Sequence, residues 1–585
     1  MLSTRLDPRP ADAPRLTAHD RLAFLFVWLP YLALARRSWF LPDDAFISFR
    51  YARNWGSGQG LCFNPGDAAP VEGYSNFLFV AIGSVLERLG LEQVFWLPFL
   101  CACAGSLLLW LVYRCARIDL GLGRLPALLA LALLGWSAPY AVWSTSGLET
   151  MPYALFFFAT VERLCLRRGG AAAWSAGGLG LLLALTRVEG IAWALLVFPI
   201  FFVLARRARG ESVRRPLARY GVVLVLGYGL YFAWRWSTFG QLFPATVYAK
   251  VGFSLERLVR GGDYVLTQVL SSPWLLAVVP GAFVALRRER RGPGVALALL
   301  PLGLAAYAAL VGGDWMCFGR FLVPALPFVA LLAAWLLADV ERRVGAPAAG
   351  VAGALLVALA VLPGFDHHVV PEALRARCHF RLNTPSYRSE YGQWRYERFE
   401  GIRWLAEGRA LRAFAPPGAS LVVGAVGALG YASDLFLLDR FGLVTPEVGE
   451  RELGNEPKLR SPGHDMGVRP TWFLEHGHEP TYLRSDLLEV GSRAELLEQL
   501  EASARRLRFL GAAERYVLDF AAVATRDDPR WFLIVWARIT RGTTTEAAWA
   551  EFAARRDAFA ATGEVRVLDV EPPDPARVPG LPDWL

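Results

Sequence analysis

Residues 94–113 read VFWLPFLCACAGSLLLWLVY, a run without a single charged side chain. A helix of about 20 apolar residues crosses the ~30 Å of hydrocarbon in a bilayer. The run ends at Arg114, and Arg117 and Arg124 follow it. An apolar run of this length next to a charged segment predicts a transmembrane helix.

Similar runs fill residues 22–364 of a 585-residue chain that is 55% hydrophobic and only 19% charged. The sequence predicts eleven spans, at 22–41, 94–113, 125–143, 149–166, 172–187, 190–205, 217–236, 264–286, 295–311, 321–338 and 347–364. Segment 77–90 is too short for a crossing and is expected to be re-entrant or interfacial. The chain is thus predicted to be a polytopic α-helical membrane protein, with a membrane domain at 1–365.

Residues 366–585 have the mixed composition of a soluble domain large enough to form its own core. RYVLDFAAVAT and WFLIVWARI predict strands, and AELLEQLEASARRL predicts an amphipathic helix. A small α/β domain is therefore expected, with a role in binding an acceptor or covering an active site.

The short loops between spans alternate between Arg-rich and Arg-poor. By the positive-inside rule, the Arg-rich loops and the N-terminus face the cytoplasm. The first loop, 42–93, and the C-terminal domain then face outward. The Arg clusters also explain the net charge of +9, so no nucleic-acid partner is expected. The seven cysteines lie mostly within spans, so free thiols are expected, with a Cys62–Cys317 bridge as the alternative.

Asp43 and Asp44 begin the first outward loop, directly after a predicted span. Pro42 and the two acids suit the start of a helix on the outer surface. One carboxylate can take the proton from an acceptor hydroxyl while the other orients a sugar or a metal ion. The alternative is that both acids simply cap a helix.

Further polar residues in the outward loops are candidates for substrate binding, because ionisable groups beside spans are costly. In the first loop, Glu72, Tyr74 and Asn76 offer the hydrogen bonds and the aromatic face that a sugar pocket needs. A solvated loop is the alternative, and Arg187 and Glu189 could simply neutralise each other. The remaining candidates are Arg50, Glu149, Arg187, Glu189, Tyr248, Asp314, Trp315 and Arg320.

Lys250 is a separate candidate, because only it and Lys458 are lysines among 61 basic Lys and Arg residues. A compact ammonium group suits a phosphate, and Arg320 could grip the same group. Alternatively, Lys250 reaches to the membrane interface from a buried position.

Several segments together resemble a known bacterial family. They are DDAFISFRYARNWGSGQGLCFNPG and VEGYSNF in the first loop, then SGLET, TRVEG, FPATVYAK, GGDW and GRF, and GAVGALGYASDLFLLDRFGL at 424–443. The family contains the mycobacterial terminal β-(1→2)-arabinofuranosyltransferase, a GT-C glycosyltransferase. Such enzymes use a polyprenyl-phosphate sugar at the outer face of the plasma membrane.

The resemblance implies that Asp43 and Asp44 hold the position of the catalytic carboxylate, and that Lys250 and Arg320 face the lipid phosphate. Where the family reads PNT, this chain has Pro244-Ala245-Thr246, so it lacks the side-chain amide of that motif. The implied partners are a polyprenyl-phosphate sugar, an envelope glycan or other acceptor, and the bilayer. The sugar, with arabinofuranose among the candidates, stays open, as does a divalent cation.

A transporter or flippase for a lipid-linked glycan is the alternative function. Its charged residues should lie in mid-span, with inverted repeats and broken helices. Here the acids and cations gather at one predicted surface, and the sequence shows no repeat. A membrane scaffold that displays a binding domain is a third reading, and it leaves these charges unexplained.

Overall fold

The computed structural model describes residues 16–67, 70–167, 172–248, 254–287, 291–382, 384, 386–449, 462–463, 467–509, 516–525, 531–541, 550, 553–554, 556–558, 561 and 566–568. Contacts divide the chain into two compact units. The helical unit comprises Met1–Trp39, Pro98–Ala233 and Phe253–Trp394. The mixed unit comprises Phe40–Leu97, Trp234–Gly252 and Arg395–Leu585. The first predicted outward loop therefore groups with C-terminal residues, and the domain limits 1–365 and 366–585 stay a prediction.

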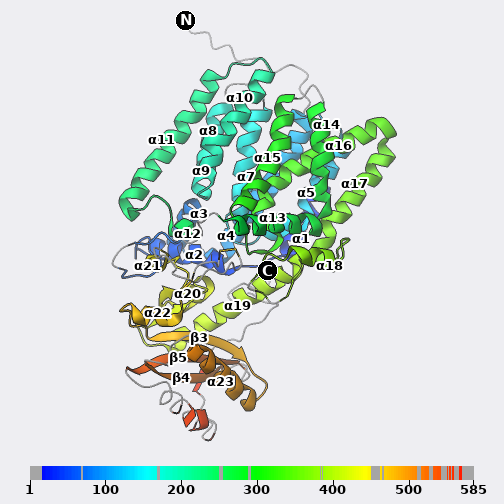
Figure 1. Ribbon diagram of the computed structural model, residues 1–585. Coiled ribbons are helices and arrows are strands. Elements are labelled where there is room, and N and C mark those ends of the chain that lie inside the picture. The colour runs from blue at the N-terminus through cyan, green and yellow to red at the C-terminus, as the bar shows by residue number, and fades with distance from the viewer. Residues whose placement is uncertain are drawn as a thin grey trace. The chain divides into compact units, whose positions relative to one another are not determined.

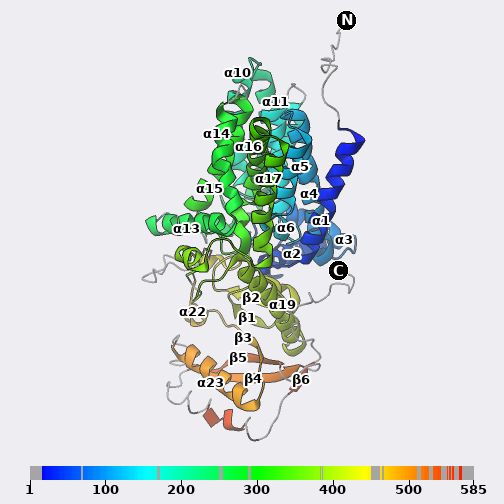
Figure 2. The same cartoon turned by 90° about the vertical axis from the view of Figure 1, so that its right-hand side faces the viewer.

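The helical unit consists mainly of long helices, several of which run in the same general direction (Figures 1 and 2). Each predicted span coincides with one or two helices, because a continuous apolar run favours the backbone pairing of a helix in lipid. The helices are α1 (Ala18–Arg37), most of α4 (Gln93–Arg114), α5 (Arg124–Gly135), α6 (Ala138–Trp143), α7 (Thr150–Val161), α8 (Ala172–Thr186), α9 (Gly190–Ala192), α10 (Phe198–Ala208), most of α11 (Arg214–Phe239), α13 (Leu255–Ser271), α14 (Val278–Arg287), α15 (Arg291–Leu310), α16 (Leu326–Val344), α17 (Ala346–Val361) and α18 (Glu372–Arg375).

Within the described ranges, five helical segments are long and apolar enough to cross a membrane. They are Gln93–Asp119, Gly190–Ala208, Arg214–Phe239, Cys317–Val344 and Ala346–Phe365. Leu255–Ser271 and Pro273–Arg287 make a sixth if the pair is one span, and three further apolar helices are shorter. A polytopic membrane protein is therefore supported, but the count of eleven spans is not confirmed. Several predicted spans are interrupted, so their helical segments are too short to be counted as crossings. The run 125–143, for example, divides into α5 and α6 around Trp136.

The predicted span 264–286 is not one straight helix. The chain breaks at Ser272, and the two helical segments on either side are bent by 98°. Segment 77–90 forms α3 (Phe77–Arg88), and at 1.5 Å per residue this helix is too short to cross the hydrocarbon. It belongs to the mixed unit, where Gly83 packs closely on Ala52.

The mixed unit contains a six-stranded sheet in the order β2-β1-β3-β5-β4-β6. Strands β1, β2 and β3 pair in parallel, β3, β5 and β4 pair antiparallel, and β6 is parallel to β4. The two strands expected from RYVLDFAAVAT and WFLIVWARI are present as β4 and β5, and the amphipathic helix as α23. The strands are β1 (Ser420–Val423), β2 (Phe436–Asp439), β3 (Tyr482–Glu489), β4 (Tyr516–Thr525), β5 (Trp531–Arg541) and β6 (Arg566–Leu568).

The helices of the mixed unit come from three separate parts of the chain. They are α2 (Asp43–Gly56), α3, α12 (Ala245–Tyr248), most of α19 (Glu390–Phe414), α20 (Gly427–Ser433), α21 (Pro446–Gly449), α22 (Pro470–Glu475) and α23 (Arg493–Phe509). Helix α20 forms the crossover that two parallel neighbouring strands, β1 and β2, require.

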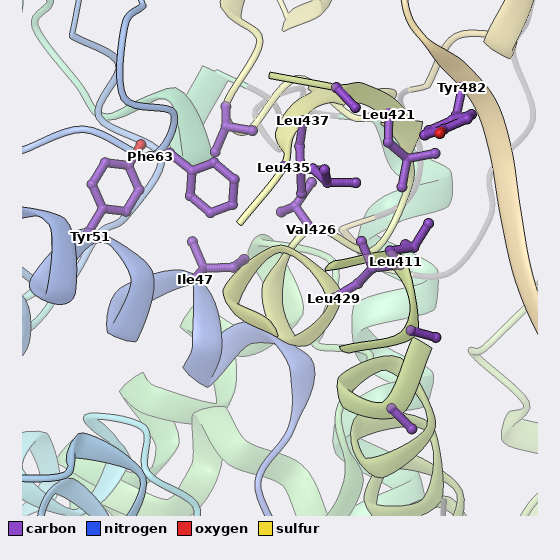
Figure 3. Close-up of a cluster of buried hydrophobic side chains, with 14 of the residues drawn as sticks. Ile47, Tyr51, Phe63, Leu411, Leu421, Val426, Leu429, Leu435, Leu437 and Tyr482 are labelled. Atoms are coloured by element: carbon purple, nitrogen blue, oxygen red, sulfur yellow. The ribbon is translucent and has the colours of Figure 1, made fainter. Parts of the chain in front are cut away.

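One hydrophobic core joins the first loop to the C-terminal part of the mixed unit. Ile47 and Tyr51 of α2 and Phe63 of the following loop face side chains of α20 and of strands β1 and β2 (Figure 3). Their partners include Leu421, Val426, Leu429 and Leu437. The position of α2, and hence of the acid pair at its start, is therefore fixed by residues nearly 400 positions further along the chain.

Candidate active site

The acid pair lies at the start of α2, as predicted. The residue before the helix is Pro42, and no side chain caps this helix terminus by a hydrogen bond. Asp43 instead reaches another helix: its two carboxylate oxygens accept the backbone N–H groups of Ala428 at 2.7 Å and of Gly427 at 3.2 Å. These are the first two residues of α20. Asp43 thus clamps α2 to the start of α20 rather than capping its own helix.

The electrostatic environment of Asp43 suits a proton acceptor. The pKa of this carboxyl is raised to about 7, mainly because burial disfavours the charged form. The nearby charges of Asp44 and Glu400 act in the same direction, and the two N–H groups act against it. A general base works best when its pKa lies near the operating pH. Asp44, the neighbouring residue, is half-buried.

The glycines of the segment 424–430 are required by close packing. A Cβ atom on Gly427 would lie 1.9 Å from the carbonyl oxygen of Asp43. A Cβ atom on Gly430 would lie 2.7 Å from Leu437 Cδ1 and 3.0 Å from Arg50 Nη1. The Gly-rich sequence GAVGALG therefore allows two helices to approach each other.

Arg50 is engaged entirely inside the mixed unit, with only 1% of its surface exposed. It donates hydrogen bonds to the carbonyl oxygens of Phe63, Gly430 and Leu435 at 2.8, 2.6 and 2.7 Å. Burial lowers the pKa of its guanidinium to about 10. These contacts make Arg50 a structural link between the first loop and the crossover helix, and its role in substrate binding stays a prediction.

The other predicted residues of the first loop also have partners in the mixed unit. Glu72 forms a buried ion pair with Arg235 at 2.5 Å, and burial raises the pKa of the Glu72 carboxyl. Asn76 accepts a hydrogen bond from Ser48 at 3.0 Å, and Tyr74 packs edge-on against Tyr51. These contacts brace the loop, and direct contact with a sugar stays a prediction for all three.

The segment FPATVYAK approaches the same loop. The backbone N–H of Ala245 donates to the carbonyl oxygen of Glu72 at 3.0 Å. Tyr248 ends the short helix α12. Lys250 lies outside the described residues, so its role remains a prediction from the sequence.

A second group of predicted residues gathers in the helical unit. Arg187 forms ion pairs with Glu149 at 2.7 Å and with Glu189 at 2.5 Å. Arg320 forms a two-point ion pair with Asp314, at 2.7 and 3.2 Å. The mutual neutralisation of Arg187 and Glu189 that the sequence left open is therefore present, with Glu149 as an additional partner.

A small pocket connects these two ion-pair groups. Among the described residues, the hydroxyl groups of Thr150 and Tyr153 have no hydrogen-bond partner although both are buried. Buried polar groups normally find a partner, so these two hydroxyls are open to a ligand or to water. The pocket is lined by Thr150, Tyr153, Arg187, Glu189, Leu304, Tyr307, Arg320, Phe321 and Pro324.

The loop that carries Asp314 and Trp315 is held by two residues that sequence reasoning missed. Arg381 donates to the carbonyl oxygen of Trp315 at 2.8 Å and pairs with Glu390 at 2.9 Å. Glu390 also accepts the N–H of Phe318 at 2.5 Å. Phe318 adopts a φ of 48°, a left-handed conformation that is unusual for an aromatic residue. Such strained residues concentrate at functional sites.

The structure thus sorts the predicted residues into two groups. Asp43, Asp44, Arg50, Glu72, Tyr74, Asn76 and the backbone of Tyr248 belong to the mixed unit. The helical unit contains Glu149, Arg187, Glu189, Asp314, Trp315 and Arg320. Arg235, Arg381 and Glu390 are additions from the structure, and an ionisable residue inside a predicted span was the available signal for Arg235. Among the described residues, no group of three or more side chains is arranged to hold a metal ion.

Comparison with solved structures identifies the fold. ArnT from Cupriavidus metallidurans, in its apo state, superposes with a TM-score of 0.51 at 16% sequence identity, covering 89% of this chain and 98% of ArnT. The chain has a GT-C fold. The prediction of this fold from the sequence is confirmed.

Two further GT-C structures are similar at lower scores. ArnT bound to undecaprenyl phosphate gives a TM-score of 0.48 at 16% identity, covering 88% of this chain and 97% of that one. The mycobacterial arabinofuranosyltransferase AftD gives 0.46 at 16% identity, covering 90% of this chain and 42% of AftD.

By sequence, residues 389–560 match a family described as a domain of unknown function, DUF8728. No curated protein matches the chain.

Proposed function

We propose that the protein transfers a sugar from a polyprenyl-phosphate donor to a hydroxyl group of a cell-envelope glycan or another acceptor, at the outer face of the bacterial plasma membrane. The GT-C fold supports a glycosyltransferase. The observation that carries the proposal is the carboxyl of Asp43, which lies beside Asp44, has a pKa raised to about 7, and is fixed by two backbone N–H groups. Arabinofuranose is the first sugar to test, because the sequence resembles an arabinofuranosyltransferase family.

Asp43 is assigned as the general base and Asp44 as the residue that orients the acceptor or a bound cation. Each carboxylate oxygen has two lone pairs, so Asp43 can accept a substrate O–H while it keeps its bonds to Gly427 and Ala428. The acceptor oxygen attacks the anomeric carbon and its proton passes to the carboxylate. The bond from that carbon to the phosphate oxygen breaks, and polyprenyl phosphate leaves with the electron pair.

Binding of the donor phosphate requires positive charge. In the described pocket, the positive charges are already balanced by carboxylates. Arg187 and Arg320 are paired with three carboxylates, those of Glu149, Glu189 and Asp314. We therefore keep the prediction from the sequence that Lys250 and Arg320 face the donor phosphate. The arrangement stabilises charge as it develops on the leaving group.

The experiment is a transfer assay with the full chain in lipid nanodiscs. Radiolabelled sugars linked to undecaprenyl phosphate, starting with arabinofuranose, are offered together with envelope glycan acceptors. The expected result is label on the acceptor, with one undecaprenyl phosphate released per sugar transferred. In sealed vesicles, movement of an intact lipid-linked sugar across the bilayer without transfer would instead support the flippase alternative and overturn the proposal.

A further inference from the structure

Helix α13 has its apolar residues on the outside and its polar residues on the inside. Its sequence is LERLVRGGDYVLTQVLS, and successive residues of a helix point about 100° apart. Leu255, Val259 and Leu266 therefore share one face, and they are 72%, 59% and 46% exposed. The opposite face is buried although it is polar, and it contains Arg260, Tyr264, Thr267, Gln268 and Ser271. A helix on a water-exposed surface shows the reverse pattern.

The orientation of α13 sets it apart from its neighbours in the helical unit. The apolar segment Pro273–Arg287, which follows α13 after Ser272, is bent from it by 98°. In both views, α13 lies crosswise to α14, α15 and α16 (Figures 1 and 2). A helix that lies across a set of long apolar helices and turns its own apolar face outward is placed to run along the membrane surface.

Exposed apolar residues continue from α13 onto the end of α15. The two helices touch closely, since a Cβ atom on Gly261 would lie 2.1 Å from the carbonyl oxygen of Ala309. Directly after Ala309 come Leu310 and Val311, which are exposed as well. The apolar surface therefore extends beyond one helix, as expected where a protein meets lipid.

The buried polar face supports the loop between α15 and α16. Arg260 donates to the carbonyl oxygen of Gly312 at 3.1 Å, and the hydroxyl of Tyr264 accepts the N–H of Phe321 at 3.2 Å. Between these two contact points lie Asp314 and Arg320, the ion pair of the candidate site. Gly313 also packs against Tyr264, where a Cβ atom would lie 2.8 Å from that of the tyrosine.

We propose that α13 is an interfacial helix whose face of Leu255, Val259 and Leu266 is immersed in the outer leaflet, at the boundary between headgroups and acyl chains. The polar face then holds the Asp314 and Arg320 loop at the depth of the lipid phosphates. The contact with lipid rests on the apolar face and the right-angle bend alone. The consequence for the lipid-linked donor rests on the proposed function.

Fluorescence from single labelled positions tests the contact with lipid. An environment-sensitive dye is attached to cysteine at position 259 or 266, in a chain where Cys62→Ser and Cys103→Ser remove the more accessible native thiols. The reference position is 475, an exposed residue of α22. In phosphatidylcholine vesicles, lipids with a nitroxide near the headgroup should quench the dye at 259 and 266 several-fold more than at 475. Iodide in the water should quench only the dye at 475.

Two results would overturn the proposal. One is quenching by iodide at 259 and 266 to the same extent as at 475. The other is a signal at 259 that lipid nitroxides leave unchanged but that shifts as the protein-to-lipid ratio rises, which would place a second copy of the chain on this face. Neither readout needs enzymatic activity, so the inference can stand or fall separately from the proposed function.

Kinetics test the consequence for the donor. Val259→Glu puts a charge on the immersed face, whereas Val259→Ala keeps it apolar. The Glu variant should raise the KM for a long-chain polyprenyl donor several-fold and leave the KM for a short-chain, water-soluble donor unchanged. Val259→Ala should behave like the wild type with both donors. An equal loss with both donors in the Glu variant would mean that the helix only supports the fold.

Discussion

The carboxylate of Asp43 and the backbone N–H of Ala428 are joined by a hydrogen bond of 2.7 Å, although the two residues lie 385 positions apart in the chain. The bond ties the start of α2 to the start of α20, within the region that matches the domain of unknown function. We infer that one task of this domain is to hold the proposed base in place.

The acid pair is the first object for mutation. Asp43→Asn and Asp44→Asn remove proton acceptance, and loss of a positioned general base costs about 10²–10⁴ in rate. At least one of the two variants should lose transfer activity to this extent in the nanodisc assay. Asp339→Asn, at a surface ion pair with Arg342 and Arg343, is the matched control and should keep full activity. If both acid variants transfer sugar at the wild-type rate, the mechanism is wrong.

The free energy of unfolding should differ between the Asp43→Asn and Asp44→Asn variants. A carboxamide has one acceptor oxygen for two N–H donors, so Asp43→Asn leaves one buried N–H poorly paired, at a cost of about 1–3 kcal/mol. Asp44→Asn should leave the stability nearly unchanged. Thermal unfolding in the same detergent would show the difference. Equal melting temperatures for the two variants would contradict the clamp between Asp43 and α20.

The pH dependence of transfer should report on Asp43. Its pKa is raised to about 7, so the proton-accepting form predominates only above that pH, and kcat/KM should rise through a midpoint near 7. Asp44→Asn removes a repelling charge and should move the midpoint to lower pH in any activity that remains. The effect on stability has the opposite sign. Because the folded state disfavours the charged carboxyl, Asp43 destabilises the fold increasingly from its ordinary pKa of 3.8 up to about 7.

Gly427→Ala tests the clamp from the other side. The added Cβ atom would lie 1.9 Å from the carbonyl oxygen of Asp43, so the backbone of one helix must shift. A shift of about 1 Å at a catalytic group can cost about 10²-fold in rate. We expect a fall in kcat with a smaller change in the KM for the donor. Gly350→Ala is the control, because a Cβ atom there would meet nothing within 4 Å, and its kcat and KM should equal those of the wild type.

Lys250→Ala should weaken use of the lipid donor. If the ammonium group binds the phosphate equally in the ground state and the transition state, the KM rises and kcat is unchanged. If the contact tightens as charge develops on the leaving phosphate, both constants change. Lys250→Arg keeps the charge and should recover part of the activity. Unchanged kinetics in a stable Lys250→Ala variant would contradict the role in phosphate binding and support the alternative, in which Lys250 only reaches to the membrane interface.

The apolar helices of the membrane domain could be predicted from the sequence, because hydrophobicity over about 20 residues is a local property, whereas the count of eleven spans stays a prediction. The start of α2 could also be predicted from local sequence, because Pro42 and the two acids favour a helix N-terminus. The break at Ser272 was missed because the apolar run continues through it. Pro273 was the available signal, since a proline disfavours helical geometry in the residue before it.

Most partners of the predicted site residues could not be predicted. Glu72 pairs with Arg235, and Arg50 with the carbonyl oxygen of Gly430, through contacts that only the tertiary fold creates. A single sequence records which side chains carry charge but not which of them meet. The division of the candidates into a mixed unit and a helical unit has the same origin, because contacts rather than chain order define it.

The shared core of α2 and α20 sets the order in which the protein can be completed. Arg50 donates a hydrogen bond to the carbonyl oxygen of Gly430, which lies 380 positions further along the chain. At about 5–20 residues per second, the ribosome needs roughly 20–80 s to synthesise the chain from Arg50 to this partner. During this interval Ile47, Tyr51 and Phe63 have no core to enter, and Asp43 has no amide clamp. A nascent or truncated chain therefore carries the acid pair without the geometry that would make it a base. Such a chain also exposes these apolar side chains to chaperones and proteases. The first loop can therefore reach its functional structure only after the C-terminal part of the chain has been synthesised.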